Sequence, residues 1–261
     1  MSKDNRYKQA LESFSKLLGI LDDLREKCPW DREQTFLSLR NLTIEETYEL
    51  SDALVEMDYE EVKKELGDIL LHIVFYSKIA DEEDRFDIKD VIDSLNQKLI
   101  RRHPHIYSDT KADDSDAVAE NWEEIKLKEG KKSVLSGVPQ GLPAMIKAYR
   151  IQEKVQGVGF DWARAEDAWA KVEEETSEFR TEVEKGDKER IEEEFGDLLF
   201  SLINYSRFVD VDPELALEKT NRKFIKRFRF IEDTLEAENK NITETSLEEM
   251  DEIWNRAKKH E

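Results

Sequence analysis

The sequence predicts an all-α protein, and three observations support that fold class. Long segments carry apolar residues at i, i+3, i+4 and i+7, the spacing of a helix with one buried face. Residues that interrupt helices are scarce, with nine Gly and five Pro in 261 residues. Segments rich in Val, Ile and Thr that alternate with polar residues, as strands do, are absent. We therefore expect helices along the whole chain.

Five helices are expected in the N-terminal half. Their approximate bounds are Tyr7 to Lys27, Thr35 to Met57, Tyr59 to Asp81, Ile88 to His103, and Asp116 to Lys128. The third has the clearest apolar spacing, at Leu66, Ile69, Leu70, Ile73 and Val74. The second and third helices must turn back on each other at Met57-Asp58 and so form a hairpin. Thr43 has the spacing of a local helix cap, although a helix running through it fits equally well.

Five helices are also expected in the C-terminal half. Their approximate bounds are Ala144 to Val155, Ala165 to Glu184, Lys188 to Val209, Pro213 to Asn239, and Ser246 to Lys259. The third repeats the apolar spacing, at Phe195, Leu198, Leu199, Leu202 and Ile203. The hairpin turn falls at Gly186-Asp187. Residues 129–143 interrupt the periodicity with Gly and Pro, so we expect a linker there between domains 1–128 and 144–261.

The same pattern of acidic residues occurs twice in the chain. The first set is Glu45, Glu46, Glu49, Glu65 and Asp68, and a shift of 129 residues gives Glu174, Glu175, Glu178, Glu194 and Asp197. Gly67 maps onto Gly196 by the same shift. Similar shifts map Lys98 and Arg102 onto Lys223 and Arg227, and Trp122 onto Trp254. The chain therefore contains an internal duplication, which predicts tandem helical domains.

Composition and charge exclude several classes of function. The net charge of -21 argues against nucleic acid or an anionic membrane as a partner. Cys28 is the only cysteine, so neither an intramolecular disulfide nor a thiolate metal site is expected. The N-terminus lacks a signal peptide, and no segment is apolar enough to span a membrane. A cytoplasmic protein is expected, and an anionic substrate would need a metal or a local cationic pocket.

The spacing of the acids predicts a cation site in each hairpin. Glu45 and Glu49 are i,i+4 on one helix, Glu65 and Asp68 are i,i+3 on the next, and the hairpin brings the two sets together. Carboxylates on facing helices at ~4 Å repel by ~4 kcal/mol at an intermediate dielectric, which a cation would offset. Acids on solvated helix faces are the plain alternative among 62 acidic residues.

Two further features favour a site over solvated faces. The acids of the returning helix interrupt the start of an otherwise apolar face. Gly67 and Gly196 each cost ~1 kcal/mol inside a helix relative to Ala, which suggests close approach of another backbone or a ligand. Oxygen ligands indicate Mg²⁺, Mn²⁺ or Ca²⁺. A di-iron site would need Glu-x-x-His pairs, which are absent, and no EF-hand loop is present. Because Mg²⁺ is commonly shared with substrate phosphates, a phosphate ester substrate is expected.

The chain resembles the MazG-type nucleoside triphosphate pyrophosphohydrolases. Their signature combines Glu-Glu-x-x-Glu with a later Glu-x-x-Asp, and this chain contains it twice. The first copy lies at residues 45–49 and 65–68, and the second at residues 174–178 and 194–197. The similarity extends to residues 28–31 and 158–162 and covers nearly the whole chain. The resemblance implies tandem all-α domains that dimerise through helix bundles. It also implies hydrolysis of NTPs and dNTPs, with broad base specificity, to a monophosphate and pyrophosphate with Mg²⁺, for which Mn²⁺ is a possible substitute.

The resemblance also implies which residues form the site. Metal ligands would be Glu175, Glu178, Glu194 and Asp197, with a possible second site at Glu46, Glu49, Glu65 and Asp68. Nucleotide contacts would be Lys171, Val172, Glu173, Glu174, Glu175, Arg190, Ile191, Glu192, Glu193, Lys223, Arg227 and Trp254. The catalytic group would comprise the metal ligands and Glu174, a spare carboxylate that we expect to orient the attacking water. Trp254 either stacks on a base or anchors the last helix.

The two halves differ in the cations that a triphosphate needs. Lys171 and Arg190 each stand one turn before an acid of the C-terminal set, and the matching N-terminal residues are Leu42 and Glu61. We therefore expect a catalytic C-terminal half and a weak or inactive N-terminal half. The alternative for both cations is simple i,i+4 ion pairing on a helix.

A homodimer is expected, because a hairpin with an apolar stripe cannot bury both faces alone and two hairpins make a four-helix bundle. The competing function is a non-catalytic helical scaffold or a sensor of nucleotide or metal, in which the acids bind a cation or a basic partner surface. Pyrophosphate release supports the enzyme, whereas binding without turnover supports the sensor.

Overall fold

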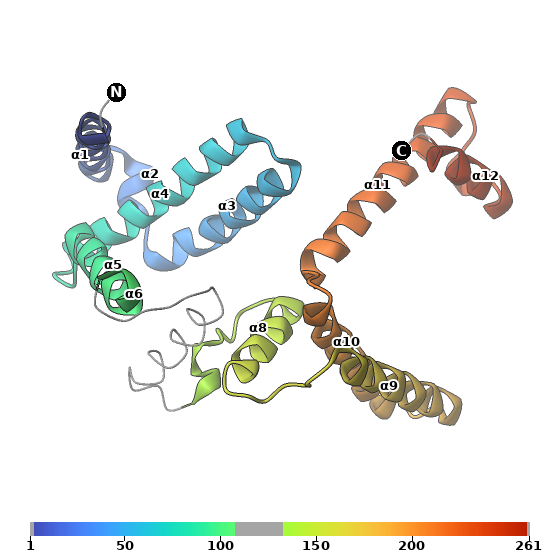
Figure 1. The fold of residues 1–261 in the computed structure, drawn as a ribbon. Helices are drawn as coiled ribbons and strands as arrows, with labels where there is room; N and C mark the ends of the chain where they lie inside the picture. The colour runs from blue at the N-terminus through green and yellow to red at the C-terminus, as the bar shows by residue number, and fades with distance from the viewer. Residues whose placement is uncertain (1–2, 108–132, 260–261) are drawn as a thin grey trace. The chain divides into compact units, whose positions relative to one another are not determined.

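The computed structural model describes residues 3–107 and 133–259, and every regular element in these ranges is a helix (Figure 1). The all-α fold class is thereby confirmed. The chain divides into two units, residues 1–111 and 112–261. Within the described ranges no helix is both long and apolar enough to cross a membrane.

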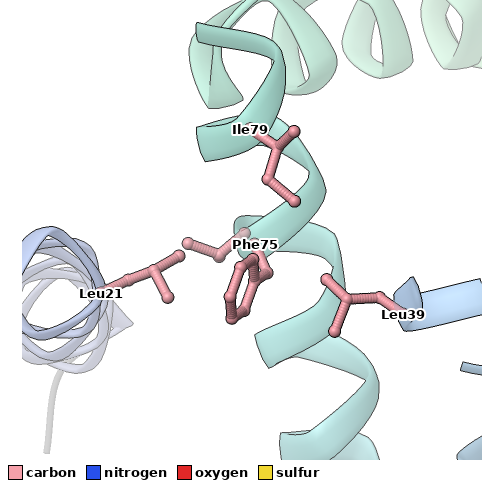
Figure 2. Close-up of a cluster of buried hydrophobic side chains, with 5 residues drawn as sticks. Leu21, Leu39, Phe75 and Ile79 are labelled. Carbon is pink, nitrogen blue, oxygen red and sulfur yellow. The ribbon is translucent and has the colours of Figure 1, made fainter. Parts of the chain in front are cut away.

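The first unit is built around the hairpin of α3 and α4. Its helices are α1 (Lys3–Lys27), α2 (Pro29–Glu33), α3 (Phe36–Glu56), α4 (Tyr59–Glu82), α5 (Ile88–Arg102) and α6 (Pro104–Tyr107). α3 and α4 pack along their length, and α1 packs against α4. Leu21 of α1, Leu39 of α3, and Phe75 and Ile79 of α4 converge on one buried cluster (Figure 2). This core fixes the hairpin that carries the first acidic set.

Local capping explains where the hairpin begins and turns. Thr35 caps α3 in a reciprocal capping box with Ser38. Met57 ends α3 in the left-handed conformation, at φ 56°, and the side chain of Asp58 accepts hydrogen bonds from the first backbone N–H groups of α4. Thr43 lies inside α3, where its hydroxyl donates to the carbonyl of Leu39. The helix therefore runs through Thr43, and the capping alternative is wrong.

The second unit contains a matching hairpin of α9 and α10. Its elements are η1 (Val134–Gly137), α8 (Ala144–Gln156), α9 (Ala165–Lys185), α10 (Lys188–Phe208), α11 (Pro213–Ala237), η2 (Ile242–Glu244) and α12 (Leu247–Ala257). Gly186 makes the turn at φ 79°, a conformation that favours glycine, and Asp187 caps α10. α8 packs against α10 and α11. Ile231, Leu235 and Ile253 form a separate buried cluster between α11 and α12.

The helix predictions are confirmed within a few residues for each expected helix in the described ranges. The sequence analysis missed the short elements α2, α6, η1 and η2. The predicted helix Asp116 to Lys128 lies outside the described residues, as do Trp122 and the first part of the predicted linker. The predicted domain boundaries at 128 and 144 stay predictions.

The two glycines inside the acidic helices do not contact another segment. A Cβ added at Gly67 or Gly196 would meet no atom within 4 Å beyond its own stretch of helix. Within the described part of this chain no other backbone therefore approaches either glycine, and the alternative, close approach of a ligand, stays a prediction. The space beside both glycines is open, which leaves it accessible to a ligand or a second chain.

Candidate active site

The α9–α10 hairpin brings together acids that are far apart in the sequence. Glu175 and Glu178 come from α9 and Glu194 from α10, and one carboxylate oxygen of each lies within 4.8 Å of the others. Glu175 and Glu194 are each only 6% exposed, whereas Glu178 is exposed. Asp197 stands outside this group of three, one turn after Glu194 on α10. The triad of oxygen ligands thus combines two buried carboxylates with one that is exposed to solvent.

The α3–α4 hairpin repeats this arrangement in the first unit. Glu46 and Glu49 of α3 and Glu65 of α4 also place oxygens within 4.8 Å of one another. Glu65 is 2% exposed, and its Oε2 atom is buried without a hydrogen-bond partner. Buried carboxylate oxygens are normally satisfied. An unpaired buried oxygen on a member of this acidic cluster fits a bound cation.

Burial and mutual repulsion change the protonation of these groups. Burial is the largest cause of the raised pKa of Glu194, and the neighbouring acids add to it against the opposing effect of Arg190. Burial likewise raises the pKa of Glu46, with Asp68 as the next cause. In contrast, the pKa of Glu65 is lowered, chiefly by its hydrogen bond from Lys64.

Two cations stand beside the C-terminal acids, as the sequence indicated. Lys171 pairs with Glu174 at 2.8 Å and with Glu175 at 2.6 Å. These two contacts, to Glu174 first, raise the pKa of Lys171, so it is charged at neutral pH. The i,i+4 ion pairing considered as an alternative is therefore observed, and it places the ammonium group of Lys171 at the acidic cluster.

Arg190 has the same position on the second helix of the hairpin. It pairs with Glu193 at 2.5 Å and with the buried Glu194 at 3.0 Å. Its side chain is 50% exposed, and that of Lys171 is 36% exposed. Both cations can therefore be reached by an anion from solvent while they remain in contact with the cluster.

The first unit keeps one cation that sequence comparison missed. Lys64 pairs with Glu61 at 3.3 Å and with the buried Glu65 at 2.9 Å. By the shift of 129 residues Lys64 matches Glu193, so the first unit carries the Arg190–Glu193 pair with its charges reversed. The comparison of matching positions, which indicated that the N-terminal site lacks two cations, therefore left out the positive charge of Lys64. The clear difference that remains is Leu42 in place of Lys171.

The other predicted nucleotide contacts fall on two surfaces. Val172 is buried, and Glu173 accepts a hydrogen bond from the indole of Trp169. On α10, Ile191 is partly buried and Glu192 is exposed. Lys223 and Arg227 lie one turn apart on α11. The guanidinium of Arg227 lies 5.4 Å from the ring centre of Trp254 on α12.

Trp254 has a packing role in the described structure. It packs against the α11–α12 core and lies 5.1 Å from the ring of Phe224, centre to centre. This packing is what the anchoring alternative predicts, and stacking of Trp254 on a base stays a prediction. Phe224 and Phe228 stack on each other and remain exposed beside it.

Comparison with known proteins identifies relatives along nearly the whole chain. The MazG nucleotide pyrophosphohydrolase domain family matches residues 34–107 and 165–230. The chain is 40% identical to a nucleoside triphosphate pyrophosphohydrolase of Escherichia coli strain K12, over 96% of this chain and 99% of that protein. It is 45% identical to the nucleoside triphosphate pyrophosphohydrolase/pyrophosphatase MazG of Thermotoga maritima, over 96% of this chain and 98% of the relative. The uncharacterized protein YabN of Bacillus subtilis is 44% identical over 95% of this chain and 52% of its own length.

Proposed function

Because the chain belongs to the MazG nucleotide pyrophosphohydrolase family, we propose that it hydrolyses nucleoside triphosphates to a nucleoside monophosphate and pyrophosphate. The proposal extends to NTPs and dNTPs with broad base specificity, and to Mg²⁺ as the cofactor with Mn²⁺ as a substitute. The observation that carries it is the triad of Glu175, Glu178 and Glu194, with cations directly beside it.

The donor set of the α9–α10 hairpin fits Mg²⁺. All the candidate ligands, Glu175, Glu178, Glu194 and Asp197, are carboxylates, and hard cations prefer oxygen. Two of them, Glu175 and Glu194, are buried at close range, and a metal cation would offset the repulsion that remains beside their ion pairs with Lys171 and Arg190. When bound, Mg²⁺ would neutralise phosphate charge and lower the pKa of a bound water.

The surrounding side chains suit the remaining tasks of binding and orientation. Lys171 and Arg190 are accessible cations that can contact phosphate oxygens in place of their present acidic partners. Glu174 is half-exposed and lies next to the cluster, so it can orient the attacking water through a hydrogen bond. Lys223, Arg227 and Trp254 would bind the remainder of the nucleotide.

We assign turnover to the C-terminal half and a weak or absent activity to the N-terminal half. Leu42 stands where the C-terminal half has Lys171, so the first unit lacks a cation on the first helix of its hairpin. A metal at Glu46, Glu49, Glu65 and Asp68 is compatible with that assignment, because metal binding does not need the phosphate-binding cation.

We also propose that the protein is a cytoplasmic homodimer without nucleic-acid or membrane partners. The apolar stripe on α10 leaves Phe195 49% and Leu199 40% exposed, and Leu66 on α4 is 52% exposed. Pairing with a second hairpin would cover such a stripe. Sedimentation should give a dimer at micromolar concentration, and a monomer under those conditions would overturn this part of the proposal.

Product analysis tests the activity directly. The full chain is incubated with each NTP and dNTP and Mg²⁺, and the products are separated by anion exchange. Equal amounts of monophosphate and pyrophosphate are expected, with no activity in EDTA. Release of orthophosphate with a diphosphate would show a different reaction. Binding without turnover would support the competing function as a nucleotide or metal sensor.

Matched double variants test which half is catalytic. Glu175→Gln with Asp197→Asn should lower turnover by about a hundredfold or more, a typical cost for lost charge stabilisation at an active site. Glu46→Gln with Asp68→Asn changes the equivalent N-terminal positions and should lower turnover only a few-fold. If the N-terminal pair is the more damaging, the catalytic half has been misassigned.

A further inference from the structure

The helix that follows the α9–α10 hairpin carries a strongly basic segment. Residues 219–229 of α11 include six lysines and arginines and no acid, in a chain whose net charge is -21. The hairpin helices α9 and α10 together hold thirteen acidic and six basic residues. Within the basic segment Lys223 is exposed, and the guanidinium of Arg227 lies beside the ring of Trp254. The segment and the hairpin are therefore complementary in charge, which favours their association.

The basic segment packs elsewhere than on the hairpin of its own chain. Glu194 lies fourteen residues before the end of α10 at Phe208, and Arg227 lies fourteen residues after the start of α11 at Pro213. A helix that turned back antiparallel along α10 would therefore bring Arg227 level with Glu194. In the described residues α11 instead packs mainly on α8 and α12, and it leads away from the hairpin (Figure 1). The cations thus point to a hairpin other than their own.

An apolar face of α11 also lacks a cover in the single chain. Ile231 and Leu235 on this face are buried against α12. Towards the start of the helix the same face continues with Phe228, Phe224 and Leu217, and all three are exposed. A row of exposed large apolar side chains beside cations is typical of a surface that binds another protein. The stripe and the basic segment therefore belong to one contact surface.

We propose that the basic segment of α11 packs on the α9–α10 hairpin of a second copy of this chain, where Lys223 and Arg227 contact the nucleotide held by that copy's acids. Exchange of an identical element between protomers gives each copy the contacts that a returning helix would make within one chain. A second copy is the occupant that fits, because its hairpin carries the acids that a returning α11 would reach. The inference rests on the proposed function and makes each active site a shared product of two chains.

Mixed dimers of the full chain test whether the cations act across the dimer. Two differently tagged chains are co-expressed, and sequential affinity steps isolate dimers that contain one of each. The first chain carries Glu175→Gln with Asp197→Asn, and the second carries Lys223→Gln with Arg227→Gln. The cation variant alone should lower turnover by about tenfold or more, through lost charge-assisted hydrogen bonds. In the mixed dimer one site combines intact acids with intact cations, so turnover should recover to about half that of the parent dimer.

The reciprocal mixed dimer predicts the opposite result. One chain is the parent sequence and the other carries all four substitutions. If the cations act across the dimer, each site lacks either its acids or its cations, and turnover should stay at least about tenfold below that of the parent. If the cations act within their own chain, this dimer keeps one intact site and the first mixed dimer keeps none. That reversed pattern would overturn the inference.

A matched variant controls for the overall charge of α11. Arg222 and Arg229 stand at i and i+7, so they share a face of the helix that differs from the face of Lys223 and Arg227. Arg222→Gln with Arg229→Gln removes the same two charges, and it should keep turnover within about threefold of the parent, because surface charges away from a contact contribute little. An equal loss in both double variants would show a general effect of charge and would overturn the contact at Lys223 and Arg227.

Photo-crosslinking locates α11 without any need for turnover. Phe224→p-benzoylphenylalanine places a photoreactive group on the exposed stripe of the full chain. After irradiation we expect a band of twice the chain mass on a denaturing gel, with position 224 joined to a peptide from residues 165–208. The same link within a band of single mass would show that α11 turns back on its own hairpin. That result, or the absence of any link to 165–208, would overturn the inference.

The outcomes separate this inference from the proposed function. If the parent protein releases pyrophosphate but the first mixed dimer stays inactive, the inference fails and the proposed activity stands. Full turnover in Lys223→Gln with Arg227→Gln would likewise overturn the inference alone. If the parent protein has no turnover, the proposed function fails and takes the nucleotide contact with it, and the crosslink then decides whether α11 packs on a second copy.

Discussion

Neutralising one acid of the C-terminal triad should make the metal-free protein more stable and the enzyme less active. Glu178 is the best position, because it is exposed and the described structure gives it no ion pair. Glu178→Gln keeps the shape of the side chain and removes its charge. A structural acid would behave in the opposite way, because its loss would lower stability and leave turnover intact.

The magnitude follows from the spacing of the triad. Charges at the 4.8 Å limit of the cluster repel by about 0.9 kcal/mol in a water-like dielectric and by about 3.5 kcal/mol at an effective dielectric of about 20. Exposure and salt favour the lower value. Removing the two repulsions that involve Glu178, each about 0.9 kcal/mol before salt screens it, should therefore stabilise the metal-free protein by about 1–2 kcal/mol. That corresponds to a rise in Tm of about 2–8 °C.

The assay compares Tm in EDTA, Tm in Mg²⁺ and pyrophosphate release for two variants. Glu178→Gln should raise Tm in EDTA, lose the Mg²⁺-induced rise that its own site contributes, and lower turnover by about a hundredfold. Glu49→Gln, the matched N-terminal variant, should raise Tm in EDTA similarly and keep turnover within about threefold, because the repulsion is equivalent there. A fall in Tm with normal turnover for Glu178→Gln would refute the reasoning.

Three further outcomes are expected. Glu46 and Glu194 have raised pKa values, which disfavour their ionised forms in the metal-free fold, so their contribution to its stability is lost as pH rises. Mg²⁺ needs the ionised carboxylates. The rise in Tm that Mg²⁺ causes should therefore disappear as the pH is lowered from 7 to about 4.5, which is above the range in which an ordinary glutamate is protonated. Arg25→Met removes hydrogen bonds to Glu82 and to the backbone carbonyls of Asp31 and Gln34, and should destabilise the first unit by about 1–3 kcal/mol in urea unfolding. Because Arg25 lowers the pKa of Glu82, the difference in unfolding free energy between the variant and the parent protein should shrink as pH falls through that pKa. The Cβ added by Gly19→Ala in α1 meets no atom within 4 Å, so the higher helix propensity of alanine should raise Tm by about 2–4 °C. A lower Tm would show that this position contacts something that the single chain lacks.

The hairpins were predictable because each of their determinants is local. The apolar spacing along α4 and α10 defines a helix, and the turns at Met57-Asp58 and Gly186-Asp187 each combine a left-handed residue with an aspartate cap. Once two helices turn back in this way, acids at fixed distances from the turn must meet. The meeting of Glu175 and Glu194 follows from that geometry alone.

The pairing of cations was less predictable, because it depends on side-chain reach. In the alignment of the two halves, Glu61 occupies the position of Arg190, which indicated that the first unit had lost a positive charge. The alignment did not reveal the positive charge of Lys64, which pairs with the buried Glu65 from the adjacent position on α4. Periodicity likewise defined the apolar face of α10 without showing what covers it, and Phe195 on that face is half-exposed in the single chain.

The difference between the two halves has a structural reason on the first helix of each hairpin. Leu42 packs against the core that joins α1 to the α3–α4 hairpin, together with Leu39 and Phe75. Its counterpart Lys171 is instead partly exposed and directs its ammonium group to the acids. One position therefore serves packing in the first unit and charge in the second. A lysine at position 42 would restore the cation only by weakening the packing of this side chain against the core, so the first unit cannot gain a cation there without a cost in its own stability.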